Sequence, residues 1–209
     1  MNLLAYGDRS LMIEVDTTDE AITWTAALGT AELPGVVDII PGARTVLLVT
    51  DSPTHLPAIR SAVGSLLPAP SGTAASAARA DELVVEVPVT YDGADLEEIG
   101  LLTGLSPSEV IAAHTGTPWK VAFGGFAPGF AYLIGGDARL EVPRRDEPRT
   151  KVPAGAVGLA GEFSGIYPRT SPGGWQLLGH TDLSMWDATR EPPALLRPGC
   201  SVQFREAGR

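Results

Sequence analysis

The chain has 209 residues, of which 44% are hydrophobic and 19% charged, so it can bury a sizeable core as one large domain or two small ones. Its net charge of -10 argues against nucleic acid as the main partner, because binding to a phosphate backbone requires a basic face. The single cysteine, Cys200, excludes an internal disulfide and a cysteine-rich metal site, and we expect no metal.

The N-terminal residues Met1–Asp8 contain neither the basic region nor the apolar region of a secretory signal. No window of the sequence approaches the roughly 18 apolar residues that cross a bilayer. We therefore expect a cytoplasmic protein with no membrane partner.

The first 70 residues predict a small α+β domain. Alternating apolar residues predict a strand at 10–15, and apolar residues in helical spacing predict a helix at 19–28. The β-rich runs 36–40 and 45–50 predict further strands, and a second helix follows at 56–67. The expected order is ββαββα, with the helices over one face of an antiparallel sheet.

A segment of small and weakly apolar residues, with proline, serine and glycine, follows this domain and predicts a linker. We place the linker at residues 71–82. It divides a first domain, residues 1–70, from a second domain, residues 83–209.

In the second domain, residues 83–90 predict a strand, and two short helices follow. Ser106 as N-cap, Pro107 at the first helical position and Glu109 as capping-box partner mark the start of the second helix. From Trp119 onward the sequence predicts only short strands bounded by glycine or proline, and such strands are typical of a barrel or a sandwich. The clearest of these strands are 121–123, 157–160, 175–178 and 201–205.

The stretch from Phe123 to Ser171 is dense in glycine and proline, which disfavours regular structure. Five of the chain's 15 lysines and arginines lie between Arg139 and Lys151. In an acidic protein, this local excess of positive charge predicts a site for a carboxylate or a phosphate.

Three arginines of this stretch, Arg144, Arg145 and Arg149, lie in a segment interrupted by prolines and so cannot form one solvated helical face. We expect at least one of them to bind an anion through paired hydrogen bonds. The alternative is a set of surface ion pairs with Asp146 and Glu147.

Aromatic rings near these arginines can form the apolar walls of a small-molecule site, although core packing is the alternative for each ring. Gln176 lies in a predicted strand, where a buried amide would need a hydrogen-bonding partner and could orient a substrate. The expected substrate-binding residues are Phe126, Pro128, Phe130, Tyr132, Tyr167, Ser171, Trp175 and Gln176.

His114 lies in the last turn of the second helix of this domain. A histidine titrates near neutral pH and can act as a general base. A histidine in that position is also favoured by the helix dipole alone, which is the alternative interpretation. The sequence contains none of the common signatures for nucleotide phosphates, serine hydrolases or zinc hydrolases.

A series of ordered motifs runs from about Leu83 to the C-terminus. The densest are Tyr91-Asp92-Gly93-x-Asp95-Leu96, Gly125-Phe126-x-Pro128-Gly129-Phe130-x-Tyr132-Leu133, Pro143-Arg144-Arg145-x-x-Pro148-Arg149, Val152-Pro153-x-Gly155, Gly165-Ile166-Tyr167-Pro168 and Ser171-Pro172-Gly173-Gly174-Trp175. In these motifs the chain resembles the family of B-type subunits of bacterial ATP-dependent 5-oxoprolinases. The family is also called allophanate hydrolase subunit 1, or the KipI-like family of sporulation-kinase inhibitors.

The resemblance implies a cyclophilin-like β-barrel after the α+β domain, so the expected fold class is α+β. It also implies ATP as co-substrate and two partners in the 5-oxoprolinase complex, the A-type subunit and the C-type subunit, which is a second cyclophilin-like chain. Such complexes open 5-oxo-L-proline to L-glutamate, and we expect the chain alone to be inactive. In this scheme Arg144, Arg145 and Arg149 would neutralise a transferring phosphoryl group, and His114 or Glu162 would manage protons.

Two other functions remain open at this point. The chain could be an inhibitory protein that binds a sporulation-type histidine kinase, or part of a complex that metabolises allophanate or urea. The chain departs from the family's pattern at three sites: Trp119 stands where we expect tyrosine, Gly179-His180-Thr181-Asp182 where we expect Gly-Arg-Thr-Pro, and Cys200 where we expect aspartate.

Overall fold

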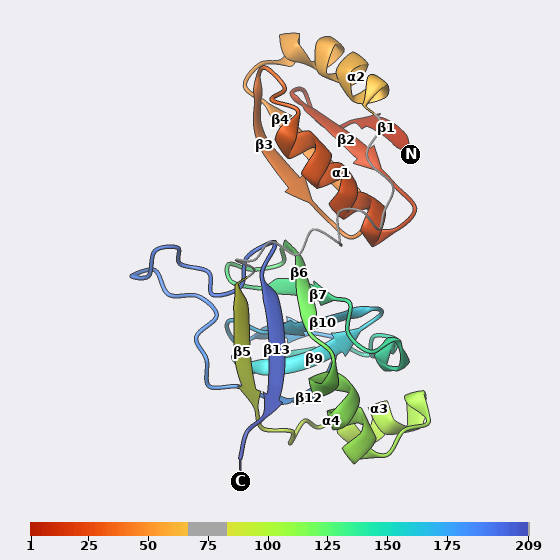
Figure 1. The fold of residues 1–209 in the computed structure, drawn as a ribbon, viewed down its shortest axis with the longest axis vertical. Helices are drawn as coiled ribbons and strands as arrows, with labels where there is room; N and C mark the ends of the chain where they lie inside the picture. Colours follow the sequence, from red (N-terminus) through yellow and green to blue (C-terminus); the bar gives the residue numbers. More distant parts are fainter. Residues whose placement is uncertain (67–82, 209) are drawn as a thin grey trace. The chain divides into compact units, whose positions relative to one another are not determined.

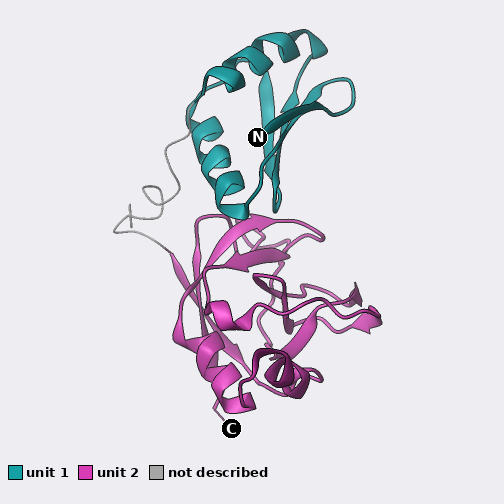
Figure 2. Ribbon diagram, turned by 90° about the vertical axis from the view of Figure 1, so that its right-hand side faces the viewer, with its two compact units in different colours: residues 1–80 teal, residues 81–209 magenta. Residues whose placement is uncertain are grey.

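The computed structural model describes residues 1–66 and 83–208, and the chain divides into two compact units, Met1–Ala80 and Asp81–Arg209 (Figure 2). The predicted linker, residues 71–82, lies outside the described residues. Within the described part, no helix is both long and apolar enough to span a membrane.

The first unit is a four-stranded antiparallel sheet with two helices (Figure 1). Its strand order is β1-β2-β4-β3. In chain order the elements are β1 (Asn2–Ala5), β2 (Ser10–Glu14), α1 (Thr18–Thr30), β3 (Val36–Pro41), β4 (Thr45–Thr50), the short 3-10 helix η1 (Pro53–His55) and α2 (Leu56–Ser65). This is the predicted order ββαββα, although α2 ends at Ser65 because the backbone is already extended at Leu66.

One face of this sheet carries the core of the first unit. Leu11 lies opposite Leu48, and Ile13 lies opposite Val46, so the four side chains point to the same face. They form one buried cluster with residues of both helices, including Trp24 of α1. Both helices therefore cover the same face, as the apolar spacing in the sequence predicts.

The second unit is built on a seven-stranded sheet of order β12-β9-β10-β7-β6-β13-β5. A bridge between Thr90 and His180 brings the strands at the two ends of this order together, so that the sheet closes into a nearly complete barrel. The elements are β5 (Val84–Val89), α3 (Leu96–Thr103), α4 (Pro107–Gly116), β6 (Trp119–Gly124), β7 (Ala131–Ile134), η2 (Ala138–Leu140), β8 (Arg149–Val152), β9 (Ala156–Ala160), β10 (Phe163–Ile166), β11 (Ser171–Gly173), β12 (Gln176–His180) and β13 (Ser201–Glu206).

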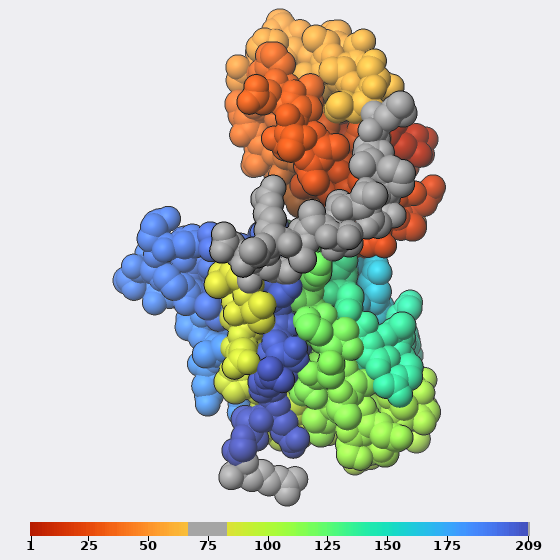
Figure 3. Space-filling view, in the orientation of Figure 1, coloured from red at the N-terminus to blue at the C-terminus, as the bar shows by residue number. Residues whose placement is uncertain are grey.

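The two ends of the second unit's chain lie side by side, because β5 and β13 pair in parallel from Val84↔Ser201 to Val89↔Glu206 (Figure 3). The remaining short strands, β8 and β11, form a separate two-stranded sheet. The predicted fold class, an α+β unit followed by a cyclophilin-like β-barrel, is confirmed.

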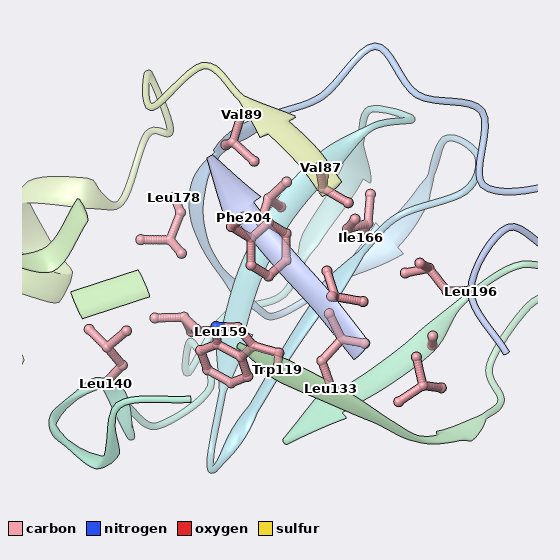
Figure 4. Close-up of a cluster of buried hydrophobic side chains, with 14 of the residues drawn as sticks. Val87, Val89, Trp119, Leu133, Leu140, Leu159, Ile166, Leu178, Leu196 and Phe204 are labelled. Carbon is pink, nitrogen blue, oxygen red and sulfur yellow. The ribbon is translucent and has the colours of Figure 1, made fainter. Parts of the chain in front are cut away.

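The interior of the barrel is a single apolar cluster that includes Leu133, Leu159 and Phe204 (Figure 4). Helix α4 packs against β13 and begins with the predicted capping box. The Ser106 hydroxyl accepts a hydrogen bond from the Glu109 N–H at 3.3 Å, and Glu109 Oε2 accepts one from the Ser106 N–H at 2.8 Å. This cap fixes the start of the helix that carries His114.

We expect the fragment Asp81–Arg209 to fold without the first unit. Its core clusters contain only residues of its own unit, so removal of residues 1–80 takes no side chain from them. The measurement is thermal unfolding of the fragment, followed by circular dichroism. A fragment without a cooperative transition would show that the second unit depends on the first.

Candidate functional site

Aromatic side chains gather on the outer face of the barrel, on the opposite side of β9 and β12 from its interior. Strand β9 shows the alternation, because Val157 and Leu159 belong to the barrel core whereas Ala156 and Ala160 belong to a second cluster. We call this second group, with the rings that touch it, the aromatic cluster. Its central rings are Phe126, Phe130, Tyr132, Tyr167 and Trp175, and Phe123 and Phe163 lie against Tyr132 at its border.

Phe130 lies at the centre of the aromatic cluster. Its ring centroid is 5.3 Å from that of Trp175, 5.5 Å from that of Tyr167 and 5.1 Å from that of Tyr132, each in an edge-to-face arrangement. Phe126 meets Phe130 in the same way at 5.3 Å. Such pairs stabilise each other and fix the ring planes. The structure therefore brings together all five rings that the sequence predicts for a substrate wall.

The loop between β6 and β7 holds Phe126 in a left-handed backbone conformation with φ of 65°. This conformation is unfavourable for a non-glycine residue and is enriched at functional sites. The turn is held by hydrogen bonds from the Ala127 N–H to Gly125 O at 2.7 Å and from the Phe130 N–H to Ala127 O at 2.9 Å. As a result the Phe126 side chain is 59% exposed, and Pro128 is exposed beside it.

Two of the predicted arginines bind a buried carboxylate, that of Asp95. Arg145 Nη1 and Arg149 Nη2 both donate to Asp95 Oδ1, at 2.9 and 2.7 Å. The backbone N–H of Leu177 donates to Oδ2 at 2.7 Å. The alternative of ion pairs with Asp146 and Glu147 is therefore wrong for Arg145 and Arg149. We call Asp95, Arg145 and Arg149 the two-arginine cluster.

The backbone before α3 sets the position of Asp95. The N–H groups of Gly93 and Asp95 donate to the carbonyls of Leu178 and Leu177 at 3.0 and 3.2 Å, so this segment runs beside β12. A Cβ at position 93 would collide with the backbone of Leu177 and Leu178, so only glycine permits this approach. Asp95 is therefore 3% exposed, immediately behind the strand that carries the aromatic cluster.

Burial of Asp95 acts to raise its pKa. The hydrogen bonds from Arg149 and the Leu177 N–H, together with the charges of Arg149 and Arg145, outweigh burial, so the pKa lies below its ordinary value of 3.8. Asp95 is therefore ionised at neutral pH, and its single negative charge faces two positive ones.

Arg144 is exposed, and its charge acts on the aromatic cluster. Burial raises the pKa of Tyr132, and the Arg144 charge opposes this rise. Burial also raises the pKa of Tyr167, against a backbone hydrogen bond from Trp175 and the charges of Arg144 and Arg149. Positive charge thus lies beside the apolar wall, as an amphipathic ligand requires.

The two uncharged polar residues of the predicted set lie on different faces. Ser171 of β11 lies opposite Val152 of β8, which is part of the aromatic cluster, so its side chain shares that face. Gln176 lies opposite Leu159, whose side chain is in the barrel core. Both are at least nine-tenths buried, and among the described residues neither Ser171 Oγ nor Gln176 Oε1 has a hydrogen-bonding partner.

His114 is fully buried inside the barrel, away from solvent. Its Nδ1 lies 2.7 Å from the Tyr91 hydroxyl, its Nε2 lies 3.0 Å from Ser164 Oγ, and its ring stacks on Phe204 at 4.1 Å. Burial lowers its pKa to about 3. A general base must reach its substrate, and both ring nitrogens of His114 already contact protein groups. This placement does not fit proton transfer and instead ties α4 to the barrel.

Glu162 is exposed in the turn between β9 and β10. It precedes Phe163, whose ring lies 5.4 Å from that of Tyr132, so the turn is at the border of the aromatic cluster. The described residues contain no group of three or more histidine, cysteine or acidic side chains that could hold a metal ion.

The chain matches the family model described as carboxyltransferase domain, subdomain C and D, over residues 1–196. It is 37% identical over 205 residues to the 5-oxoprolinase B subunit of Escherichia coli O157:H7, and the match covers 95% of this chain and 92% of that relative. It is 38% identical over 214 residues to the 5-oxoprolinase B subunit of Bacillus subtilis (strain 168), covering 95% of this chain and 89% of the relative.

Solved structures share the fold. The crystal structure of TTHA0988 superposes with a TM-score of 0.75 at 35% identity, and the match covers 96% of this chain and 40% of that one. The urea carboxylase of Kluyveromyces lactis superposes with a TM-score of 0.72 over 99% of this chain and 22% of that one. At 18% identity this second likeness shows the fold alone. The chain thus spans less than half of either solved chain.

We predict that Asp95→Asn destabilises the protein by roughly 2–4 kcal/mol at pH 7, because the two arginines lose a buried ionic partner. The depressed pKa of Asp95 means that its contribution is present above pH 3.8 and is lost as the pH falls through the folded-state pKa. Urea unfolding from pH 7 to pH 3 should show the gap between wild type and variant narrowing at low pH. A gap independent of pH would contradict the ionic role.

We also predict that His114 makes the protein less stable as the pH falls from 6.5 to 5. Its pKa in the fold is about 3, so only the unfolded chain takes up a proton in this range, with a slope of at most about 1.4 kcal/mol per pH unit. Chemical unfolding at several pH values measures this slope. It should disappear in His114→Gln and persist in the control His55→Gln, which changes a histidine that is 42% exposed.

Proposed function

The chain belongs to the family of carboxyltransferase domains, subdomains C and D, and we propose that it is the B-type subunit of an ATP-dependent 5-oxoprolinase, which opens 5-oxo-L-proline to L-glutamate. The observation that carries the proposal is the identity of 37–38%, over 95% of this chain, to two relatives named as B subunits of 5-oxoprolinase. The site geometry supports it, because an apolar wall beside positive charge suits a small ring that bears a carboxylate.

In this function the aromatic cluster would pack against the five-membered lactam ring. Phe126, which is 59% exposed, and the partly exposed Tyr132 would be the rings that meet the ligand, whereas Phe130, Tyr167 and Trp175 are at most 5% exposed and would form the packed base beneath them. Apolar walls would also exclude water from the ring, which strengthens the electrostatic interactions there. Direct substrate contact by Phe126 and Tyr132 stays a proposal, whereas Phe130, Tyr167 and Trp175 are packed in a buried cluster, which was the alternative interpretation for each ring.

The arginines would supply the positive charge that the reaction needs. A lactam is stabilised by resonance, and phosphorylation of its carbonyl oxygen converts that oxygen into part of a good leaving group. Water would then add to the ring carbon and the C–N bond would break, which leaves γ-glutamyl phosphate, and a second water would release phosphate; the products are glutamate, ADP and phosphate. Negative charge on the transferring phosphoryl group would be stabilised by Arg144, which is exposed beside the two tyrosines. Glu162, at the border of the cluster, is the remaining candidate for moving a proton.

Partner chains would complete the enzyme. The sequence has no glycine-rich loop of the kind that holds nucleotide phosphates. We therefore propose that ATP is bound together with the A-type subunit, and that the C-type subunit, the second cyclophilin-like chain, joins the site. We also propose a cytoplasmic location for the assembled complex. A role as inhibitor of a histidine kinase stays a prediction, since no described contact favours it.

The family's description as a carboxyltransferase domain favours a second candidate, a role in a complex that acts on urea or allophanate. The two candidates differ in the ligand. Urea has neither a ring nor a carboxylate, and allophanate has a carboxylate but no ring, so both would leave the aromatic wall unused.

We predict that the purified chain alone does not hydrolyse ATP in response to 5-oxo-L-proline, and that adding the A-type and C-type subunits restores this activity. The measurement is ADP release with 5-oxo-L-proline, urea or allophanate as the added substrate. Strong activity of the isolated chain would refute the division of labour, and activity with urea or allophanate alone would favour the second candidate.

Arg144→Ala should lower the turnover number of the complex by about 10-fold to 100-fold, the value of one hydrogen bond to a charged group. Its melting temperature should stay close to that of wild type, because Arg144 is exposed. Arg205→Ala is the matched control, since Arg205 is 58% exposed and pairs with Glu86 on β5.

A further inference from the structure

The two-arginine cluster has more positive charge than its protein partner balances. Asp95 offers one negative charge, and both guanidinium groups donate to the same oxygen, Oδ1. Its other oxygen is taken by the Leu177 N–H. Neither arginine therefore forms the paired, bidentate contact that a guanidinium makes with a carboxylate of its own. One unit of positive charge remains in excess.

The side chains of both arginines are partly exposed, and each has one buried nitrogen that is unsatisfied. The side chains of Arg145 and Arg149 are 33% and 23% exposed, whereas that of Asp95 is 4% exposed. Arg145 Nε and Arg149 Nη1 have no hydrogen-bonding partner among the described residues. A buried N–H without a partner costs about 1–3 kcal/mol, so an anion that draws these groups into contact would regain that energy.

The excess charge lies next to the aromatic cluster. Leu177, which binds Asp95 through its backbone, packs its side chain into that cluster. Arg149 lies opposite Gly173 in the β8–β11 pair, the same pair of strands that carries Ser171. Ser171 is 6% exposed, and its hydroxyl has no partner among the described residues. A buried hydroxyl and two guanidinium groups thus border one apolar wall.

We propose that Arg145, Arg149 and Ser171 form a subsite for a single carboxylate group, and that Asp95 is the positioning residue that holds the two arginines. A carboxylate is planar and carries one charge, which matches the fork of a guanidinium and the one excess charge of the cluster. A phosphate carries about 1.5 to 2 charges at pH 7 and would be less well balanced. The proposal rests on the proposed function and assigns these residues the carboxylate of 5-oxo-L-proline.

The assignment divides the three arginines of the segment between two tasks. Arg145 and Arg149 would hold the substrate, and Arg144, which is exposed and not tied to Asp95, would face the phosphoryl group. The three arginines look alike in the sequence, and only the contact of Arg145 and Arg149 with Asp95 separates these two from Arg144.

Calorimetric titration without ATP tests the subsite, with the full chain alone and together with its partner chains. The probes are 5-oxo-L-proline, 2-pyrrolidinone, which is the same ring without the carboxylate, and inorganic phosphate. We expect 5-oxo-L-proline to bind at least 10-fold more tightly than 2-pyrrolidinone. Arg149→Met should reduce this ratio to about one without changing the affinity for 2-pyrrolidinone, whereas the control Arg139→Met, in an exposed arginine paired with Asp137, should keep it.

Asp95→Asn tests positioning separately from charge. If Asp95 only offsets positive charge, its neutralisation would tighten the binding of 5-oxo-L-proline. If it holds the arginines in place, the variant binds 5-oxo-L-proline several-fold more weakly while 2-pyrrolidinone is unaffected. Circular dichroism before each titration checks that every variant is folded. If Asp95→Asn is not folded, Arg145→Met tests the subsite instead, and it should weaken the binding of 5-oxo-L-proline without affecting that of 2-pyrrolidinone.

Three results would overturn the proposal: no binding of 5-oxo-L-proline in either preparation, equal binding of the two ring compounds, or competition by phosphate that Arg149→Met abolishes. Failure of the proposed function would give a different result from failure of the subsite. A complex that discriminates the carboxylate through Arg149, yet releases no ADP with 5-oxo-L-proline, would retain the subsite and lose the 5-oxoprolinase assignment.

Discussion

The second unit depends on one buried carboxylate, that of Asp95, which joins three parts of the chain far apart in sequence. It binds Arg145, 50 residues away, and the Leu177 backbone, 82 residues away. A charge buried in this way is stable only when its partners are in place, so its fold and its electrostatics are set together. The barrel edge, the start of α3 and the arginine segment can therefore adopt this arrangement only jointly.

Two strands, β9 and β12, separate the apolar surfaces of this unit. Some of their side chains fill the barrel, including Leu159 and Leu178, and others support the aromatic cluster, including Leu177. Since the same strands serve both surfaces, the barrel provides a rigid base for the rings. The exposed end of the cluster, Phe126, is the part held by a strained turn and not by a strand.

The sequence predicts those features that depend on neighbours along the chain. The capping box of Ser106 and Glu109 belongs to this class. Of the aromatic cluster, only the rings of the loop between β6 and β7 and its end are neighbours in sequence, whereas Tyr167 and Trp175 meet Phe130 from distant segments. The partner of Arg145 and Arg149 could not be predicted, because Asp95 is distant in sequence and stands at a helix start, where an aspartate is expected as a cap. In the structure its side chain makes no cap hydrogen bond, because both carboxylate oxygens bind the arginines and the Leu177 N–H instead.

The face on which Gln176 lies could not be predicted either. A shift of one position in strand register decides whether a residue faces the rings or the barrel core, and the local sequence does not encode that choice. His114 has the polar character of a helix end, and nothing near it in the sequence reveals that β10 and β13 enclose it.

The three departures from the family pattern bear on the barrel and not on the aromatic cluster. Trp119 is buried, and its Nε1 donates to His114 O at 3.1 Å. Cys200 is part of the barrel core. His180 pairs with Asp92 at 2.8 Å, beside the bridge with Thr90 that closes the barrel, so a side chain at position 180 acts at that closure. The arginines that border the rings come instead from the segment tied to Asp95, and the site therefore keeps its positive charge whatever residue closes the barrel.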